Sequence, residues 1–319
     1  MDRRLLLLVF SLLLAACGDQ PAHQWSLAAK GAFSASLSPD GQYATVGSIE
    51  HGGSLWRLSD GERLYNWNHT QGAYSALVAS TFSTDSRFVI TAEEKRMVLW
   101  SVQSGKPGGF WPVDGGVQAL ALSDGGRFAL VGQANYSAQY IDFATGRILQ
   151  TLPHAGKINA VAISADGRIG VTGAEDGIVK VWDLLRGKET FAYRMGDDIS
   201  AVALSRDGQY VFGALYYGHG KIWEVKTGKE VAQIGYRRTT MTTARFAADN
   251  RTLLTGFTAR RVVLWDVKSG QKLQDWRADP PYFWRRSGLV VVDVAYGSKP
   301  GEYLSVFSNG LVNRWQATP

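Results

Sequence analysis

The chain is almost free of cysteine, with Cys17 as the single one among 319 residues. A lone cysteine excludes an intramolecular disulfide, so burial of apolar side chains has to stabilise the fold. Histidine is also scarce, and none of the five histidines has a cysteine or carboxylate at the spacing of metal ligands. We therefore expect neither a bound metal nor a cofactor.

Sequence signatures of common catalytic sites are missing as well. The chain has no Gly-x-Ser-x-Gly motif, phosphate loop, dinucleotide fingerprint or His-Glu-x-x-His motif. Its net charge of +6 is mild and is not accompanied by clustered base-stacking motifs. These features argue against an enzyme of a common class and against a nucleic-acid-binding protein.

The 3.6-residue apolar period of helices is largely absent, and a longer repeat takes its place. A turn of the form Ser-x-Asp-Gly, or a relative, recurs along the chain, and successive turns start 45, 40, 41, 41 and 42 positions apart. A repeat of this length determines the architecture of the whole chain. The turns begin at Ser38, Ser83, Ser123, Ser164, Ser205 and Ala247.

Two apolar stretches follow each turn, and the second ends in an aromatic residue. A second, glycine-containing turn and a further strand-like stretch follow most of these aromatics. Four short strands per unit predict an all-β propeller of seven four-stranded blades, in which the aromatics pack between blades. The aromatics are Trp56, Trp100, Tyr140, Trp182, Trp223, Trp265 and Trp315.

The fourth unit resembles the WD40 repeat family. Pro153-His154 stands where the family has Gly-His, and Val181-Trp182-Asp183 ends the third strand. In that family His, Ser or Thr, Asp and Trp form a buried hydrogen-bonded tetrad, which the resemblance assigns here to His154, Thr172, Asp176 and Trp182. Only this unit is complete, although Asn68-His69 echoes the Gly-His in the second unit. The spacing extends the resemblance over a propeller domain of residues 24–319.

The two ends of the chain predict how the ring closes. The seventh unit stops after its third strand, at residues 311–315. Its fourth strand has to come from elsewhere, and the segment Gln24-Trp25-Ser26-Leu27 is the expected donor. Closure in this way removes exposed sheet edges that would otherwise invite aggregation.

The first residues carry a targeting pattern. Arg3-Arg4 precede an apolar run at 5–16 that is too short to span a bilayer as a helix, and the run ends in Leu14-Ala15-Ala16-Cys17. This pattern resembles a bacterial lipoprotein signal, which implies a signal peptide at 1–16, a lipidated Cys17 and a short tether at 17–23. An ordinary cleaved signal with an incidental cysteine is the alternative.

The residues after the cysteine bear on which membrane holds the anchor. Gly18 stands where an inner-membrane retention signal would have Asp, so we expect the periplasmic face of the outer membrane. Asp19, one position later, keeps the inner membrane as the alternative. Multiple acyl chains on one cysteine would anchor the protein stably.

One sector of the propeller is expected to bind a partner. The long irregular segment at 279–286 should share a face with the loops at 216–219, 235–238 and 259–261, while the acidic residues at 93–94, 114, 175 and 197–198 lie across the ring. Arginine and aromatic residues are enriched at interaction hot spots, so we predict a protein partner of acidic character. The alternative is scattered, solvated arginines with aromatics folded back onto the blades. The candidate residues are Tyr236, Arg237, Arg238, Arg260, Arg261, Tyr282, Phe283, Trp284, Arg285 and Arg286.

The sequence as a whole predicts a monomeric propeller that acts as a non-catalytic interaction scaffold, lipid-anchored to a membrane, in envelope assembly or secretion. A second hypothesis is a propeller enzyme or small-ligand binder whose site is assembled at the mouth of the central channel from single residues of separate blades. A third is a quinoprotein-type assembly propeller, because turns such as Asp142 to Gly146 look alike in both classes.

Overall fold

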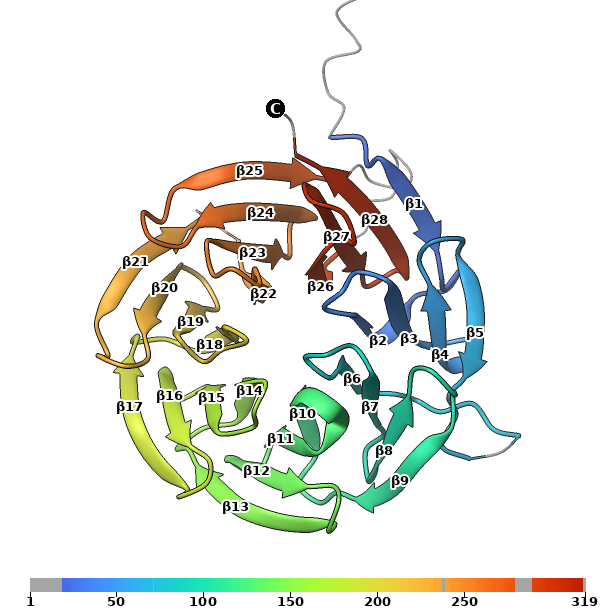
Figure 1. Ribbon diagram of the computed structural model, residues 1–319, viewed down its shortest axis with the longest axis horizontal. Helices are drawn as coiled ribbons and strands as arrows, with labels where there is room; N and C mark the ends of the chain where they lie inside the picture. The colour runs from blue at the N-terminus through green and yellow to red at the C-terminus, as the bar shows by residue number, and fades with distance from the viewer. Residues whose placement is uncertain (1–18, 71, 237–238, 279–288, 318–319) are drawn as a thin grey trace, which may run out of the picture.

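The protein forms a ring of seven four-stranded antiparallel sheets around a central channel (Figure 1). The computed structural model describes residues 19–70, 72–236, 239–278 and 289–317. These residues form 28 strands and one short 3-10 helix, η1 (Asp124–Gly126). The seven-bladed all-β propeller predicted from the repeat is confirmed.

Blades 1 to 6 each consist of four consecutive strands, ordered from the channel outward. The strands of blades 1 to 3 are β2 (Ala32–Leu37), β3 (Tyr43–Ser48), β4 (Gly52–Arg57), β5 (Glu62–Asn66), β6 (Ala79–Phe82), β7 (Phe88–Ala92), β8 (Arg96–Ser101), β9 (Pro107–Pro112), β10 (Val117–Leu122), β11 (Phe128–Gln133), β12 (Ser137–Asp142) and β13 (Arg147–Pro153). Those of blades 4 to 6 are β14 (Ile158–Ile163), β15 (Ile169–Ala174), β16 (Ile178–Asp183), β17 (Lys188–Arg194), β18 (Ile199–Leu204), β19 (Tyr210–Leu215), β20 (His219–Glu224), β21 (Glu230–Gly235), β22 (Met241–Phe246), β23 (Thr252–Phe257), β24 (Arg261–Asp266) and β25 (Lys272–Arg277).

Blade 7 joins the two ends of the chain. It contains β26 (Val291–Tyr296), β27 (Glu302–Phe307) and β28 (Leu311–Gln316), and its outer strand is β1 (His23–Ser26). Trp25 lies opposite Val312, and the amide of Leu27 donates to the carbonyl of Gly310 at 2.9 Å. Figure 1 shows β1 beside β28. The predicted closure is confirmed, with the strand one residue earlier than expected.

The blades pack face to face, and the burial pattern follows from this arrangement. The second and third strands of a blade, such as β15 and β16, are mostly buried on both faces because a neighbouring blade covers each face. The outermost strands, such as β17, remain largely exposed or half-buried. Apolar runs in the middle strands and mixed composition in the outer strands are therefore what this packing requires.

The Ser-x-Asp-Gly turn is held by its own side chains. In blade 4 the Ser164 hydroxyl donates to Asp166 Oδ1 at 2.7 Å and accepts the amide of Ile169 at 3.0 Å. The glycine adopts a left-handed backbone, as Gly167 does with φ of 73°. Where the motif lacks glycine, Asn250 takes the same conformation with φ of 59°, which asparagine tolerates better than most residues.

The antiparallel order separates the turns into two faces of the ring. We call the upper face the side that carries the turns between second and third strands, such as 49–51, and the connections between blades, such as 67–78. We call the lower face the side that carries the turns between first and second strands, such as 38–42, and between third and fourth strands, such as 58–61.

One aromatic of the repeat is placed differently from the sequence interpretation. Trp182 lies opposite Gly170 in blade 4, whereas in blade 3 the equivalent pair is Ala129 with Ile141. Tyr140 is one position earlier, so its side chain faces the opposite side of the sheet and its hydroxyl donates to the carbonyl of Gly167 at 2.9 Å. The period of the strand, rather than aromatic character, fixes which residue occupies the tryptophan position.

Candidate functional site

The four tetrad residues of blade 4 form one connected chain of hydrogen bonds. The Thr172 hydroxyl lies 2.6 Å from His154 Nε2 and 2.8 Å from Trp182 Nε1, which donates to it. The other imidazole nitrogen, Nδ1, lies 2.8 Å from Asp176 Oδ2. Two strands, the turn between them and a connection between blades are thereby joined around one threonine, and the polar side chains satisfy one another inside the protein.

The pKa values of both ionisable members, His154 and Asp176, lie below their ordinary values. Burial lowers the pKa of His154, although the neighbouring Asp176 opposes this shift. Burial would raise the pKa of Asp176, but hydrogen bonds from the Ala155 amide and from His154 hold it below its ordinary value. The imidazole is therefore neutral at pH 7 and serves as a structural hydrogen-bonding group.

A second, partial tetrad lies in blade 2, around the His69 that the sequence places in the position of His154. His69 Nε2 lies 2.8 Å from the Thr91 hydroxyl, which also accepts from Trp100 Nε1 at 2.8 Å. Glu93 stands in the place of the aspartate, with Oε2 3.2 Å from His69 Nδ1, but this nitrogen makes no hydrogen bond to a described residue. The blade 2 tetrad is therefore incomplete, whereas all four members of the blade 4 tetrad are joined by hydrogen bonds. The Asn68-His69 pair was the available signal, but a longer connection and a glutamate concealed the other members.

The centre of the ring is a second candidate site. A cavity of about 540 Å³ is lined by the innermost strand of every blade, mainly with alanine, serine, threonine and valine side chains. Small residues are required here because seven strands converge on the axis. The resulting channel is large enough for a small molecule.

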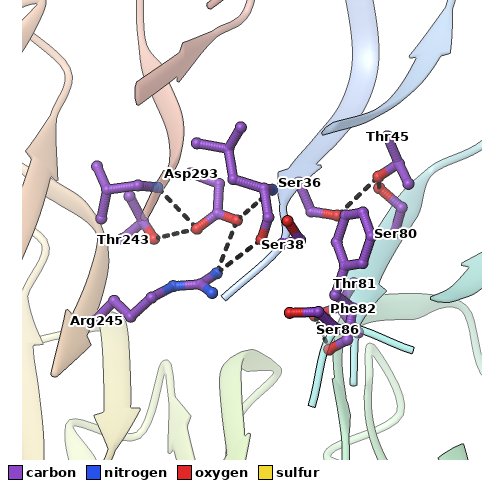
Figure 2. A network of polar contacts seen from close by, with 12 residues as sticks. Ser36, Ser38, Thr45, Ser80, Thr81, Phe82, Ser86, Thr243, Arg245 and Asp293 are labelled. Carbon is purple, nitrogen blue, oxygen red and sulfur yellow. Dashed lines mark hydrogen bonds and ion pairs between the residues drawn. The ribbon is translucent and has the colours of Figure 1, made fainter. Parts of the chain in front are cut away.

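One ion pair crosses the channel wall at the junction of three blades. Arg245 of blade 6 lies 3.1 Å from Asp293 Oδ2 of blade 7, and the same carboxylate oxygen accepts the amide of Leu37 in blade 1 at 2.9 Å. Thr243 donates to the other carboxylate oxygen at 3.2 Å, and Arg245 also donates to the carbonyl of Leu37 at 3.3 Å (Figure 2). No sequence motif pointed to this network.

A comparison with family models gives one match. The model described as "WD domain, G-beta repeat" (WD40) matches residues 146–183. Blade 4 contains a WD40 repeat. The match runs from the outer strand of blade 3 to the third strand of blade 4 and includes all four tetrad residues. It favours the WD40 interpretation over the quinoprotein one. No curated protein matches the chain.

Compared with the WD40 repeat of blade 4, other blades keep only part of the tetrad. Trp265 Nε1 donates to the Thr255 hydroxyl at 2.8 Å in blade 6, and Trp315 Nε1 donates to the Ser305 hydroxyl at 2.9 Å in blade 7. In blade 5, Gly213 occupies the place of the threonine. The bond between tryptophan and hydroxyl persists where the histidine is lost.

The predicted partner surface is only partly described. Tyr236 and Arg261 lie together, with Arg261 Nη1 2.6 Å from the Tyr236 hydroxyl and the guanidinium stacked 4.5 Å above the ring. Both contact Asp275, which Lys272 also contacts at 2.8 Å. Arg260 is half-buried in the turn between β23 and β24. The remaining predicted residues, Arg237, Arg238, Tyr282, Phe283, Trp284, Arg285 and Arg286, lie outside the described residues, as does Cys17.

These contacts change the expected electrical contrast across the upper face. Asp275 neutralises Arg261 on the sector expected to be basic. On the opposite sector, Lys157 lies 3.2 Å from Glu175 and Arg96 lies 3.7 Å from Glu93. Ion pairs form on both sectors, between residues that are separated in the sequence. The charge difference between the two sectors is therefore smaller than predicted, among the described residues.

Two searches of the described residues gave negative results. No group of three or more histidine, cysteine, aspartate or glutamate side chains is placed to hold a metal ion within the described ranges. Within the same ranges, no helix has the length and apolar character needed to cross a membrane.

Proposed function

We propose that the protein is a non-catalytic scaffold that binds other proteins through the upper face of its propeller. WD40 propellers commonly act as protein-interaction scaffolds. The observation that supports this function is the distribution of exposed apolar side chains. Of twelve large apolar side chains exposed among the described residues, six lie in the turns and connections of the upper face: Ile49, Tyr74, Val78, Tyr136, Tyr216 and Tyr217.

The lower face differs in both composition and contacts. Leu185 is its one large exposed apolar side chain in the described ranges. Its turns bind one another: the Gly125 amide donates to Asp85 Oδ2 at 2.8 Å, and Arg206 lies 2.8 Å from Asp124. Polar groups on the lower face are thus occupied in joining blades, whereas the upper face presents apolar groups to solvent. Clustered exposed apolar groups mark interaction surfaces.

The basic sector remains part of the proposal. Tyr216 and Tyr217 are exposed, with 69% of Tyr217 accessible, and their rings meet edge to face at 4.8 Å. Their turn lies beside Gly235, because His219 pairs with Gly235 across β20 and β21. We include Arg260 and the predicted residues at 237–238 and 282–286 in this surface, which would bind a partner of acidic character.

We further propose that Cys17 is lipidated and holds the propeller at the periplasmic face of the outer membrane. The support is the sequence Leu14-Ala15-Ala16-Cys17 after a basic and apolar leader. A tether at 17–23 would keep the propeller close to the lipid surface. A partner in the same membrane, within envelope assembly or secretion, fits this geometry.

Crosslinking in intact cells, followed by purification and mass spectrometry, tests both proposals. We expect a membrane protein to be recovered in stoichiometric amount with the wild type and lost with Cys17→Ala. The double variant Tyr216→Ala/Tyr217→Ala and the triple variant Trp284→Ala/Arg285→Ala/Arg286→Ala should lose it while keeping the melting temperature, and Leu185→Ala on the lower face should keep it. Equal recovery with all variants would refute the upper-face proposal.

The channel supports a second candidate function, binding of a small ligand. Arg245, paired with Asp293, is partly accessible inside a cavity of about 540 Å³ and offers guanidinium hydrogen-bond donors to a ligand. Screening small carboxylates and phosphates by thermal shift, with Arg245→Met as the control, tests it. A stabilisation that depends on Arg245 would support this function over a scaffold alone.

A further inference from the structure

Equivalent positions beside the third-strand tryptophan carry opposite charges in different blades. In blade 4, Lys180 Nζ lies 3.2 Å from Glu189, which faces Trp182 across the strand pair. In blade 5, Lys221 lies 2.7 Å from Glu230, which faces Trp223. A lysine on the third strand and a glutamate on the fourth thus neutralise each other beside the tryptophan.

Blade 1 has a serine and an arginine at these two positions. Ser54 replaces the lysine, and Arg63 faces Trp56 where the glutamate would be. Within the described ranges no carboxylate lies within 4 Å of the Arg63 guanidinium, which instead sits 5.8 Å above the Trp56 ring. The positive charge of Arg63 is thus left without an opposite charge, unlike the lysine–glutamate pairs at these positions in blades 4 and 5.

Polar atoms beside Trp56 are buried but unused. Arg63 Nε and His51 Nδ1 are inaccessible and make no hydrogen bond to any described residue. Both side chains adjoin the same tryptophan, since the His51 and Trp56 rings are 6.4 Å apart. Burial lowers the pKa of His51, and the Arg63 charge acts in the same direction. A charge held partly away from water without a counter-charge also costs stability, so an acidic group that paired with the half-buried Arg63 would recover part of that cost.

Exposed apolar residues border this group on the upper face. Ile49 is 51% accessible and precedes His51 in the turn between β3 and β4, and Tyr74 is 73% accessible. Tyr74 is close enough to Arg63 to act on its charge. A site that places one unpaired cation beside apolar and aromatic surface has the composition of an interaction hot spot.

We propose that Arg63, His51 and Trp56, together with Ile49 and Tyr74, bind an aspartate or glutamate side chain in an apolar-flanked segment of a protein partner. The proposal rests on the scaffold function and names a binding site on it. It places the contact for an acidic partner over blade 1, whereas the sequence pointed to blades 5 to 7. A guanidinium binds a carboxylate through two parallel hydrogen bonds, which gives direction as well as energy.

The charges around the site favour a single carboxylate over a phosphate group. Arg63 is one positive charge, and His51 is neutral at pH 7 because its pKa is lowered. Lys30, in the connection before β2, is paired with Glu50 at 3.3 Å and adds no unpaired charge beside His51. A group with two negative charges would therefore be undercompensated.

Selection of peptides against the folded protein tests the proposal. A phage library of random twelve-residue peptides is selected on the full chain and counter-selected on Arg63→Ala. We expect enriched peptides to contain Asp or Glu beside a large apolar residue. A synthetic copy of the best peptide should bind at least 10-fold more weakly to Arg63→Ala, and Arg186→Ala, at an exposed arginine in the turn after β16, should bind as the wild type does.

A charge exchange distinguishes direct contact from loss of structure. The acidic residue of the peptide is changed to Lys, which should abolish binding to the wild type and restore it to Arg63→Glu. Enriched peptides without an acidic residue, or affinity unchanged by Arg63→Ala, would overturn the proposal. So would inorganic phosphate that displaces the peptide stoichiometrically, or a dimer in solution that Arg63→Ala dissociates.

The same experiment separates this proposal from the scaffold function. If no peptide depends on Arg63 but a crosslinked partner is still recovered through Tyr216 and Tyr217, the blade 1 site is wrong and the scaffold function stands. If neither the peptides nor a partner are recovered, both are wrong.

Discussion

Blades 1 and 4 share a strand pattern and a tryptophan but use their polar residues differently. In blade 4, Thr172 lies opposite Lys180 and connects His154 to Trp182. In blade 1, Val46 and Ser54 occupy the equivalent pair, and Trp56 Nε1 donates to Ser54 on its own strand at 2.9 Å. One blade directs its polar groups inward to join strands, and the other leaves an arginine and a histidine near the surface.

The difference indicates that some blades of one propeller can stabilise the fold while others present polar residues for binding. A complete tetrad fixes its blade from within, so its polar residues are not free to contact a partner. Blade 1 lacks the tetrad and is held by its neighbours, through packing against Trp25 of β1 and through the Arg245–Asp293 contacts to Leu37 at the channel. Substitutions in the two blades should therefore have different effects on stability and on binding.

The largest difference is expected on removal of the tryptophans. Trp182→Ala should reduce the free energy of unfolding by about 4 kcal/mol, because Trp182 is buried and its removal leaves a cavity. Trp56→Ala should cost about half as much, since Trp56 is half-buried. Urea unfolding followed by circular dichroism measures both. Equal losses would show that the tetrad adds nothing to packing.

The second largest loss of stability is expected on removal of the hydroxyl at the centre of the tetrad. Thr172→Val should destabilise the protein by about 2 to 3 kcal/mol, because His154 Nε2 and Trp182 Nε1 would stay buried without a partner. Thr91→Val in blade 2 should cost a similar amount, and Thr172→Ser should recover part of the loss. An unaffected Thr91→Val protein would contradict a working second tetrad.

The contacts that hold blade 1 from outside can be broken at Asp293. Asp293→Asn should cost about 2 kcal/mol, because hydrogen bonds to a charged group are replaced by weaker ones. Hydrogen exchange should accelerate at the amide of Leu37 and stay unchanged at that of Val181 in blade 4. Faster exchange in both blades would mean that the network stabilises the ring as a whole.

Acid should weaken blade 4 through its histidine. The pKa of His154 is lower in the folded protein than its unfolded value of about 6.5. The unfolded chain therefore binds more protons below that pH, and stability is lost as the pH falls from about 6.5 toward the folded pKa. The loss is at most about 1.4 kcal/mol per unit of pKa difference. Comparison of denaturation at pH 7.5 and 5.5 with His154→Gln checks this, because the variant should show a smaller loss.

The smallest effect on stability is expected from exchanging surface charges. Arg63→Glu puts the charge of Glu189 at the equivalent position of blade 1 and should change the free energy of unfolding by less than about 1 kcal/mol, because Arg63 is half-buried and loses no ion pair. Binding of an acidic peptide should nevertheless be lost. A large stability change would show that Arg63 has a structural role, and the reciprocal variant Glu189→Arg in blade 4 serves as the matched control.

The sequence determined the fold because its signals are local. Ser164 and Asp166 close their own turn, and the apolar strands alternate with turns at a constant period, so seven four-stranded blades follow without knowledge of long-range contacts. Closure by residues 24–27 followed from counting strands. The tetrad of blade 4 was assignable because its four members have the spacing typical of the repeat.

Only the tertiary structure decided which side chains meet between blades. Glu93 replaces an aspartate beside His69, and Asp293 contacts Leu37 from the other end of the chain, because ring closure brings distant residues together. Tyr140 was misplaced because aromatic character does not reveal which face of a strand a residue occupies. The isolation of Arg63 likewise depends on which carboxylates the folded ring brings near it, and strand periodicity contains no information about that.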